Sequence, residues 1–289
     1  MKAGKRVLSA IVILVLLVAG ATGCASHLPK QPAPTTESST TVPDTSVIAP
    51  DSQPSTEGTE PPATEPPVTE PPVTEPPEKR LTVCIDAGHQ RYGISEKEPN
   101  GPGSDVMKAK LTSGGRGVST GIAEYQLNLD VSLLLEQELL ARGYDVLMIR
   151  RTNDCPLSNA ERAQVANESG ADIFVRIHAN GLDDPSVSGA LCCAPTTANP
   201  YLTDAVIRLS RAIVDRFCAA TGAINRGLMS TDTMTGINWC EIPVTIVEMG
   251  FMTNPAEDEK MATDEYRATM VQGIADGIDV YFGIGDMGS

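Results

Sequence analysis

Aromatic residues are scarce in this 289-residue chain, at 4% of all residues, and residues 25–79 contain none. The same stretch holds 14 of the 22 prolines. A segment dominated by Pro, Thr, Ser and Glu buries too little apolar surface to offset its chain entropy. A packed core is therefore excluded there. The fold is expected in residues 80–289, which are long enough for one domain with a sizeable core.

Basic residues are also few, since 22 Lys and Arg stand against 37 Asp and Glu, for a net charge of −15. The first 24 residues contribute +3 and residues 25–79 contribute −7, which leaves −11 on the predicted domain. Proteins that bind nucleic acid neutralise its phosphates with Lys and Arg. The charge balance therefore excludes nucleic acid as a partner.

The apolar run Val7–Val18 is too short to span a membrane comfortably. It follows three basic residues and precedes several small ones, which predicts that residues 1–23 are a secretion signal. The sequence Ala21-Thr22-Gly23-Cys24 resembles a bacterial lipobox, although Ala21 stands where that pattern prefers Leu. The resemblance implies that Cys24 is lipidated and becomes the mature N-terminus. The alternative is ordinary cleavage after a small residue, which would leave a free secreted protein.

Residues 24–79 are interpreted as a disordered stalk. The unit Thr-Glu-Pro-Pro occurs four times between residues 59 and 77, without the apolar content that a stacked repeat needs. Proline favours polyproline II and the glutamates repel one another, so the stalk is expected to be extended. We expect an exported domain, anchored by lipid to the outer face of the cytoplasmic membrane and facing the cell wall.

Strand and helix patterns alternate along residues 80–289. β-type runs cover residues 81–85, 144–149, 172–177, 189–193 and 244–247. Helical patterns begin at residues 124, 159, 203 and 264, and Ser158 with Glu161 forms a capping box before the second of them. This order predicts an α/β domain whose sheet is at least partly parallel. Residues 90–123 show little periodicity and are expected to form a long functional loop.

Histidine is rare, with three in the chain, and His27 belongs to the stalk. His89 and His178 each follow an apolar strand pattern. Ligand sites gather at strand ends in open α/β sheets. A single histidine in such a place is more often a structural residue, but two in equivalent positions favour a shared metal.

Two acidic residues are further candidates for the site, one within an apolar strand pattern and one at the start of a helix pattern. Glu248 interrupts an otherwise apolar run, Val244–Phe251. A buried carboxylate is costly there unless it is protonated, lies beside a metal or pairs with an arginine. The spacing alone does not favour the metal over the arginine, or the arginine over the metal. Glu124 opens the first long helix, where the macrodipole favours an acid even without a functional role.

Four motifs together resemble the zinc-dependent N-acetylmuramoyl-L-alanine amidases of the type 3 family, which hydrolyse the cell wall. They are Ile85-Asp-Ala-Gly-His89, Glu124 leading into Asn128-Leu129, Arg176-Ile-His-Ala-Asn180, and Val247-Glu-Met-Gly-Phe-Met-Thr-Asn254. The resemblance spans residues 81–283 and departs from the family at Ala87, where proline is frequent. It implies a single domain with a mixed, largely parallel sheet flanked by helices, and peptidoglycan as the substrate.

The resemblance also implies that His89, Glu124 and His178 bind Zn²⁺ and that Glu248 is the catalytic carboxylate. Two imidazoles and one carboxylate leave a zinc ion one open position, as catalytic zinc requires. Zinc lowers the pKa of bound water from about 15.7 toward 7. Glu248 would accept the water proton and pass it to the departing amine. Asp86 is expected to orient a ligand imidazole.

The predicted function is therefore a peptidoglycan amidase that cleaves the bond between N-acetylmuramic acid and L-alanine. A zinc peptidase acting on stem or other secreted peptides is one alternative, and a non-catalytic cell-surface binding module is another. The presence of all four site residues argues against the binding module. The sequence leaves the oligomeric state open, and a monomer is expected.

Six cysteines remain after Cys24, and none has the Cys-x-x-Cys spacing of a structural zinc site. Cys84 is expected to be a buried apolar residue. Adjacent residues of a strand point to opposite faces, so Cys192 and Cys193 are not expected to pair with each other.

Overall fold

The structure is a computed structural model that describes residues 80–196 and 204–284. The predicted signal, Cys24 and the stalk lie outside the described residues. What is predicted for them stays a prediction. None of the described helices is long and apolar enough to cross a membrane.

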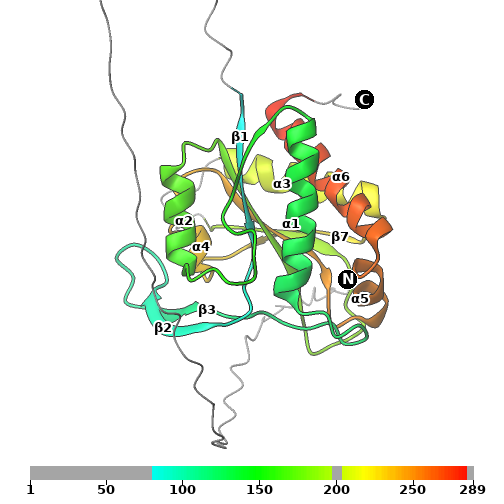
Figure 1. The fold of residues 1–289 in the computed structure, drawn as a ribbon, viewed down its shortest axis with the longest axis horizontal. Coiled ribbons are helices and arrows are strands. Elements are labelled where there is room, and N and C mark those ends of the chain that lie inside the picture. Colours follow the sequence, from blue (N-terminus) through cyan, green and yellow to red (C-terminus); the bar gives the residue numbers. More distant parts are fainter. Residues whose placement is uncertain (1–79, 197–203, 285–289) are drawn as a thin grey trace, which may run out of the picture. The chain divides into compact units, whose positions relative to one another are not determined.

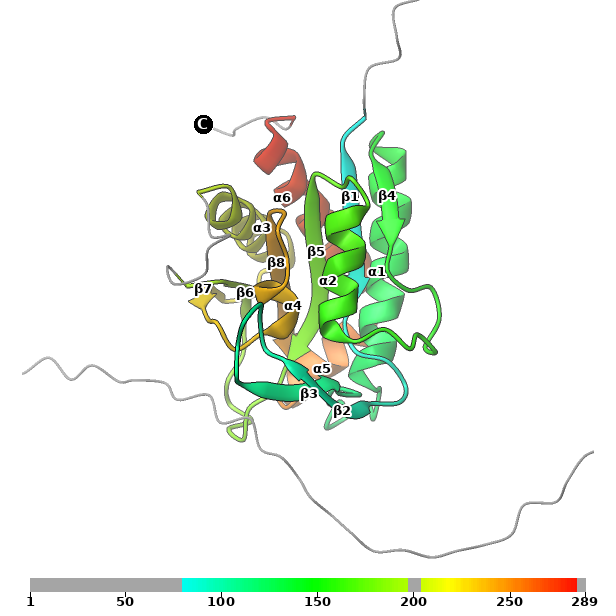
Figure 2. The ribbon, with the colours of Figure 1, turned by 90° about the vertical axis from the view of Figure 1, so that its left-hand side faces the viewer.

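The centre of the domain is a six-stranded sheet with the strand order β4-β1-β5-β8-β6-β7 (Figure 2). Its strands are β1 (Thr82–Ala87), β4 (Asp145–Met148), β5 (Ile173–Asn180), β6 (Ala190–Ala194), β7 (Asn225–Ser230) and β8 (Val244–Phe251). All neighbours are parallel except β6 and β8, which are antiparallel. The prediction of an α/β domain with a mixed, largely parallel sheet is confirmed.

Helices cover both faces of this sheet (Figures 1 and 2). One face carries α1 (Glu124–Ala141), α3 (Asp204–Thr221) and α6 (Asp264–Phe282), and the other carries α2 (Asn159–Glu168) and α4 (Thr235–Asn238). Alternate strand residues point to opposite faces. Cys192 accordingly packs in the first core and Cys193 in the second, as predicted. All six cysteines of the domain are buried and free.

The helix signals in the sequence are confirmed by the structure. The buried face of α1 contains Leu127, Val131, Leu135 and Leu139 at helical spacing. Gly143 follows this helix with a φ of 90°, a conformation that glycine adopts without steric cost. At the start of α2 the Ser158 hydroxyl accepts a hydrogen bond from the Glu161 backbone N–H. The Glu161 carboxylate in turn accepts one from the Ser158 backbone N–H.

Residues 90–123 are not the single long loop that the sequence predicted. They contain an antiparallel pair of strands, β2 (Ile94–Pro99) and β3 (Met107–Leu111). β2 is largely polar and does not alternate, whereas β3 alternates apolar residues with lysine from Met107 to Leu111, a short strand signal that the prediction of a loop passed over. The pair packs toward α4, where the Trp239 indole donates to the Pro99 carbonyl at 2.9 Å. The sequence also missed β7, α4 and the short helix α5 (Pro255–Met261).

Candidate metal centre

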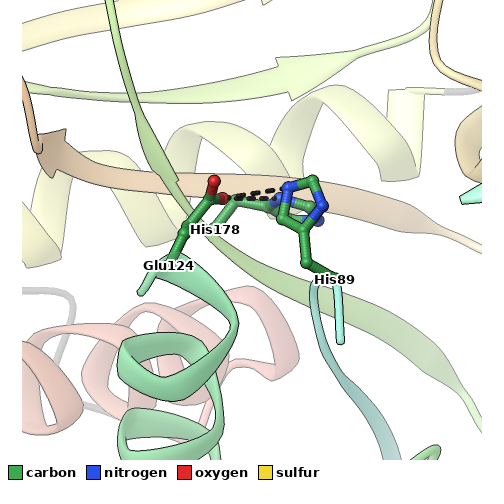
Figure 3. Close-up of side chains that lie close together, drawn as sticks. All are labelled: His89, Glu124 and His178. Atoms are coloured by element: carbon green, nitrogen blue, oxygen red, sulfur yellow. Dashed lines mark hydrogen bonds and ion pairs between the residues drawn. The ribbon is translucent and has the colours of Figure 1, made fainter. Parts of the chain in front are cut away.

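The strand order brings the two histidines together. β1 and β5 are parallel neighbours, with Ala87 opposite Ile177, so the segments that follow these residues meet at one edge of the sheet. His89 lies just beyond β1, and His178 lies near the end of β5. Glu124, the first residue of α1, points toward both imidazoles (Figure 3). One ligand atom from each of the three residues can be chosen so that all lie within 4.8 Å of one another.

His89 presents one ring nitrogen to the centre and anchors the other. Its Nε2 lies 3.1 Å from Glu124 Oε1, and its Nδ1 lies 2.9 Å from the carbonyl oxygen of Thr112. A carbonyl oxygen only accepts hydrogen bonds, so Nδ1 carries a proton, and Nε2 is the ring nitrogen that faces Glu124 and can be given to a metal. Metal-binding histidines commonly have this arrangement. The segment that follows β3 therefore sets the tautomer of His89.

His178 packs against a glycine that the first motif supplies. Its Nδ1 lies 3.3 Å from Glu124 Oε1, while its Nε2 is buried without a hydrogen-bond partner among the described residues. A Cβ on Gly88 would stand 2.2 Å from that Nε2. Burial lowers the pKa of His178 to about 4, so the imidazole is neutral, the form that binds a metal.

Glu124 is buried and held by backbone and side-chain donors. Its Oε2 accepts from the Gly115 N–H at 2.8 Å, and its Oε1 accepts from the Ala179 N–H at 3.3 Å. The amide of Asn128, one turn along α1, lies 3.4 Å from Oε1 and also donates to the Gly88 carbonyl at 3.2 Å. The carboxylate therefore has a fixed position between the two imidazoles.

Glu248 lies beside this cluster on the next strand. In the β5–β8 pair it is directly opposite His178, so both side chains leave the same face of the sheet. Among the described residues its Oε2 is buried with no hydrogen-bond partner, and no arginine forms an ion pair with it. Burial, together with the charge of Glu124, raises the pKa of Glu248 to about 8. The pairing with an arginine that the sequence left open is not what the structure contains.

Asp86 is fully buried and bonded to two arginines. Its carboxylate oxygens lie 2.8 Å from Arg162 and 2.9 Å from Arg176. No hydrogen bond among the described residues joins Asp86 to an imidazole, but Arg162 also donates to the carbonyl of His89 at 3.3 Å. Arg162 therefore connects the Asp86 carboxylate to the backbone of His89. The expected role of Asp86 as an orienting residue stays a prediction.

The sequence predictions gave no role to the buried arginines near the site. Arg150, Arg162 and Arg176 are 3%, 0% and 2% exposed. A signal was present for two of them. Arg162 falls on the buried alanine face of α2, and Arg176 interrupts an apolar strand. A charge on a face that is otherwise apolar marks a residue with buried partners.

The segment after β3 was expected to be functional, and its contacts lie at the site. Gly114 has a φ of 77°, and a Cβ there would stand 2.6 Å from Glu124 Oε2. Farther along, the buried Asp258 of α5 accepts from the backbone N–H groups of Ser119 and Thr120 at 2.7 and 2.8 Å. The segment is thus held at both the site and α5.

The chain matches known proteins over the part of the sequence that forms this domain. The profile of the Amidase_3 family, described as N-acetylmuramoyl-L-alanine amidase, matches residues 83–280. N-acetylmuramoyl-L-alanine amidase LytC of Bacillus subtilis is 30% identical over 165 residues, which are 57% of this chain but 32% of LytC. The chain thus spans about a third of that relative. YqiI of the same organism is 29% identical over 201 residues, or 70% of this chain and 84% of YqiI.

A solved structure has the same fold. The crystal structure of the N-acetylmuramyl-L-alanine amidase Ami1 from Mycobacterium smegmatis superimposes with a TM-score of 0.65 at 26% identity. The match covers 71% of this chain and 98% of the Ami1 chain.

Proposed function

The chain belongs to the N-acetylmuramoyl-L-alanine amidase family, and we propose that it uses one Zn²⁺ to hydrolyse the amide bond between N-acetylmuramic acid and L-alanine in peptidoglycan. One observation carries the zinc-dependent chemistry. The side chains of His89, Glu124 and His178 converge, with ligand atoms within 4.8 Å of one another, beside Glu248, whose buried Oε2 has no hydrogen-bond partner in the described part of the chain.

The donor set fits a catalytic zinc ion. Two imidazole nitrogens and one carboxylate oxygen are zinc ligands, and three protein ligands leave the fourth position open. Ligand atoms bound tetrahedrally at about 2.0–2.1 Å from zinc are separated by roughly 3.3 Å. His89 Nε2 and His178 Nδ1 lie 3.1 and 3.3 Å from Glu124 Oε1. The preformed spacing therefore supports zinc binding by these three residues.

Zinc, when bound, acts as a Lewis acid that makes a water molecule more acidic and polarises an amide carbonyl. The chain's own residues supply the proton transfers. Glu248, with Oε2 free of hydrogen bonds, accepts a proton from the attacking water. The same carboxyl then donates that proton to the departing nitrogen as the C–N bond breaks. The products are a carboxylate on the lactyl group and a free amine on L-alanine.

Product analysis tests this function. Purified peptidoglycan is incubated with the zinc-loaded chain, and the soluble products are separated and sequenced from their amino ends. An amidase releases intact stem peptides with a new L-alanine amine and leaves the glycan strands uncut. Cleavage confined to bonds within the stem peptide would instead identify a zinc peptidase, and no release at all would support a binding module.

We also propose that the chain is exported, lipidated at Cys24 and held on the stalk of residues 24–79 outside the cytoplasmic membrane. The basic start, the short apolar run and the small residues before Cys24 support this placement. Cys24→Ser should release the protein from the membrane or block its processing, as measured by fractionation of cells. A variant that is processed like the wild type and still stays fully membrane-bound would contradict lipidation.

A further inference from the structure

Arg150 is a buried charge that no ion pair explains. Arg150 is the second residue after β4, and 3% of it is exposed. The neighbouring Arg162 and Arg176 both pair with Asp86, whereas Arg150 has no carboxylate partner among the described residues. Burying an unpaired charge is costly. The hydrogen bonds of Arg150 must therefore account for its place in the fold.

Four of those hydrogen bonds reach backbone carbonyls, and three of the four lie beside the metal centre. Nε donates to the Ala87 carbonyl at 2.6 Å. One terminal nitrogen, Nη2, donates both to the Gly88 carbonyl at 3.0 Å and to the Tyr125 carbonyl at 2.7 Å. The other terminal nitrogen, Nη1, donates to the Thr152 carbonyl at 3.0 Å, two residues farther along the same loop.

These carbonyls belong to the immediate neighbours of two ligands. Gly88 precedes His89, and Tyr125 follows Glu124. The two ligands come from segments 35 residues apart that no strand pairing joins. One planar guanidinium therefore connects the backbone that carries the first imidazole to the helix start that carries the carboxylate.

The backbone at His89 needs such support. Its φ of 61° is left-handed, a conformation that disfavours residues with a Cβ and persists where surrounding contacts hold it. Ala87 is the last residue of β1 and Gly88 is the next residue, so their carbonyls need donors where the strand ends. A lysine at position 150 would keep the charge but would lose the fork that reaches several carbonyls at once.

We propose that Arg150 is a positioning residue that fixes His89 relative to Glu124 and so sets the zinc affinity of the centre. Among the described residues its hydrogen bonds reach backbone carbonyls and the Asn153 side chain and no ligand side chain, so it acts through the backbone of Gly88 and Tyr125. The proposal rests on the proposed zinc-dependent function.

The test compares Arg150→Lys and Arg150→Met with the matched control Arg151→Lys in the full chain. Arg151 is the next residue, its side chain is 59% exposed, and it pairs with the largely buried Glu136. The dissociation constant for Zn²⁺ is measured by competition with a chromophoric chelator, after circular dichroism has shown that each metal-free variant is folded. Both Arg150 variants should bind zinc about 10–100-fold more weakly than the wild type, which is the loss typical when a group that orients a metal ligand is removed. The control should match the wild type.

Different outcomes separate the two proposals. A wild-type chain that binds no zinc contradicts the proposed function itself. A wild-type chain that binds zinc, with folded Arg150 variants of equal affinity, overturns the positioning role and leaves the function standing. Lower thermal stability with unchanged zinc affinity has the same meaning, because it identifies a purely structural residue. If neither Arg150 variant folds, Arg150 serves the fold alone and the proposal is likewise overturned.

Discussion

Glu248→Gln separates catalysis from metal binding. The amide has nearly the same shape as the carboxyl but cannot accept the proton of water. Because Oε2 has no hydrogen-bond partner among the described residues, the substitution breaks no described bond there. General acid–base groups contribute about 10²–10⁴-fold to rate, so turnover of peptidoglycan should fall by at least that factor, or about 3–5 kcal/mol of activation free energy.

Three measurements on the same preparation make this result decisive. Release of stem peptides gives the rate, elemental analysis gives the zinc content, and thermal unfolding gives the stability. Zinc should stay near one per chain, because three ligands are supplied without Glu248. Stability should not fall, since burial already disfavours the ionised carboxyl, as its raised pKa indicates. The exposed Glu241, which lies just before the same strand, provides the matched control Glu241→Gln.

Two results would refute this reasoning. Loss of zinc from Glu248→Gln would make Glu248 a metal ligand. Full activity with zinc still bound would assign the proton transfers to another group. The described residues place no other carboxyl opposite His178 in the sheet.

The remaining predictions concern the metal and its support. His178→Ala should lower the zinc content from near one to near zero by elemental analysis, and an unchanged content would remove the basis of the mechanism. Gly88→Ala should reduce zinc affinity at least tenfold in chelator competition, because its Cβ would stand 2.2 Å from His178 Nε2; normal affinity would mean that the imidazole binds from another position. Asp86→Ala should cost about 3–5 kcal/mol in denaturant unfolding, because it leaves Arg162 and Arg176 buried without their carboxylate. Burial alone would raise the pKa of Asp86, but the two arginines hold it well below its usual range. The stability that this carboxylate contributes is therefore present above its unfolded-state pKa of about 3.9 and is lost as pH falls toward the folded-state value. The variant should show a flatter acid-unfolding profile, and a profile as steep as the wild type's would assign the dependence to other acids.

The segment between His89 and Glu124 contacts both of these proposed metal ligands. Thr112, just beyond β3, holds the outer nitrogen of His89, and Gly115 holds the outer oxygen of Glu124. The β2–β3 pair is thus continuous with the backbone that positions two proposed ligands. Changes in this hairpin are expected to reach the metal centre through Thr112.

The sequence was most informative where structure depends on near neighbours. The helical pattern predicted to begin at residue 264 coincides with the start of α6, and the Ser158 capping box marks the start of α2. Helical periodicity and caps involve residues three or four positions apart, so a single chain displays them directly. Strand β2 escaped detection because strand pairing is not local and its mostly exposed polar residues carry no alternating pattern, while the alternation of β3 is confined to five residues.

The sequence by itself thus determined the alternation of strands and helices, and it singled out His89, Glu124, His178 and Glu248 as chemical candidates. Only the tertiary structure decided how they work together. Parallel pairing of β1 with β5 brings the two histidines to one edge, and the β5–β8 register places Glu248 opposite His178. Which imidazole nitrogen faces the centre depends on the Thr112 carbonyl, 23 residues from His89. Such contacts join residues that are distant along the chain, and their geometry exists only after the backbone has folded.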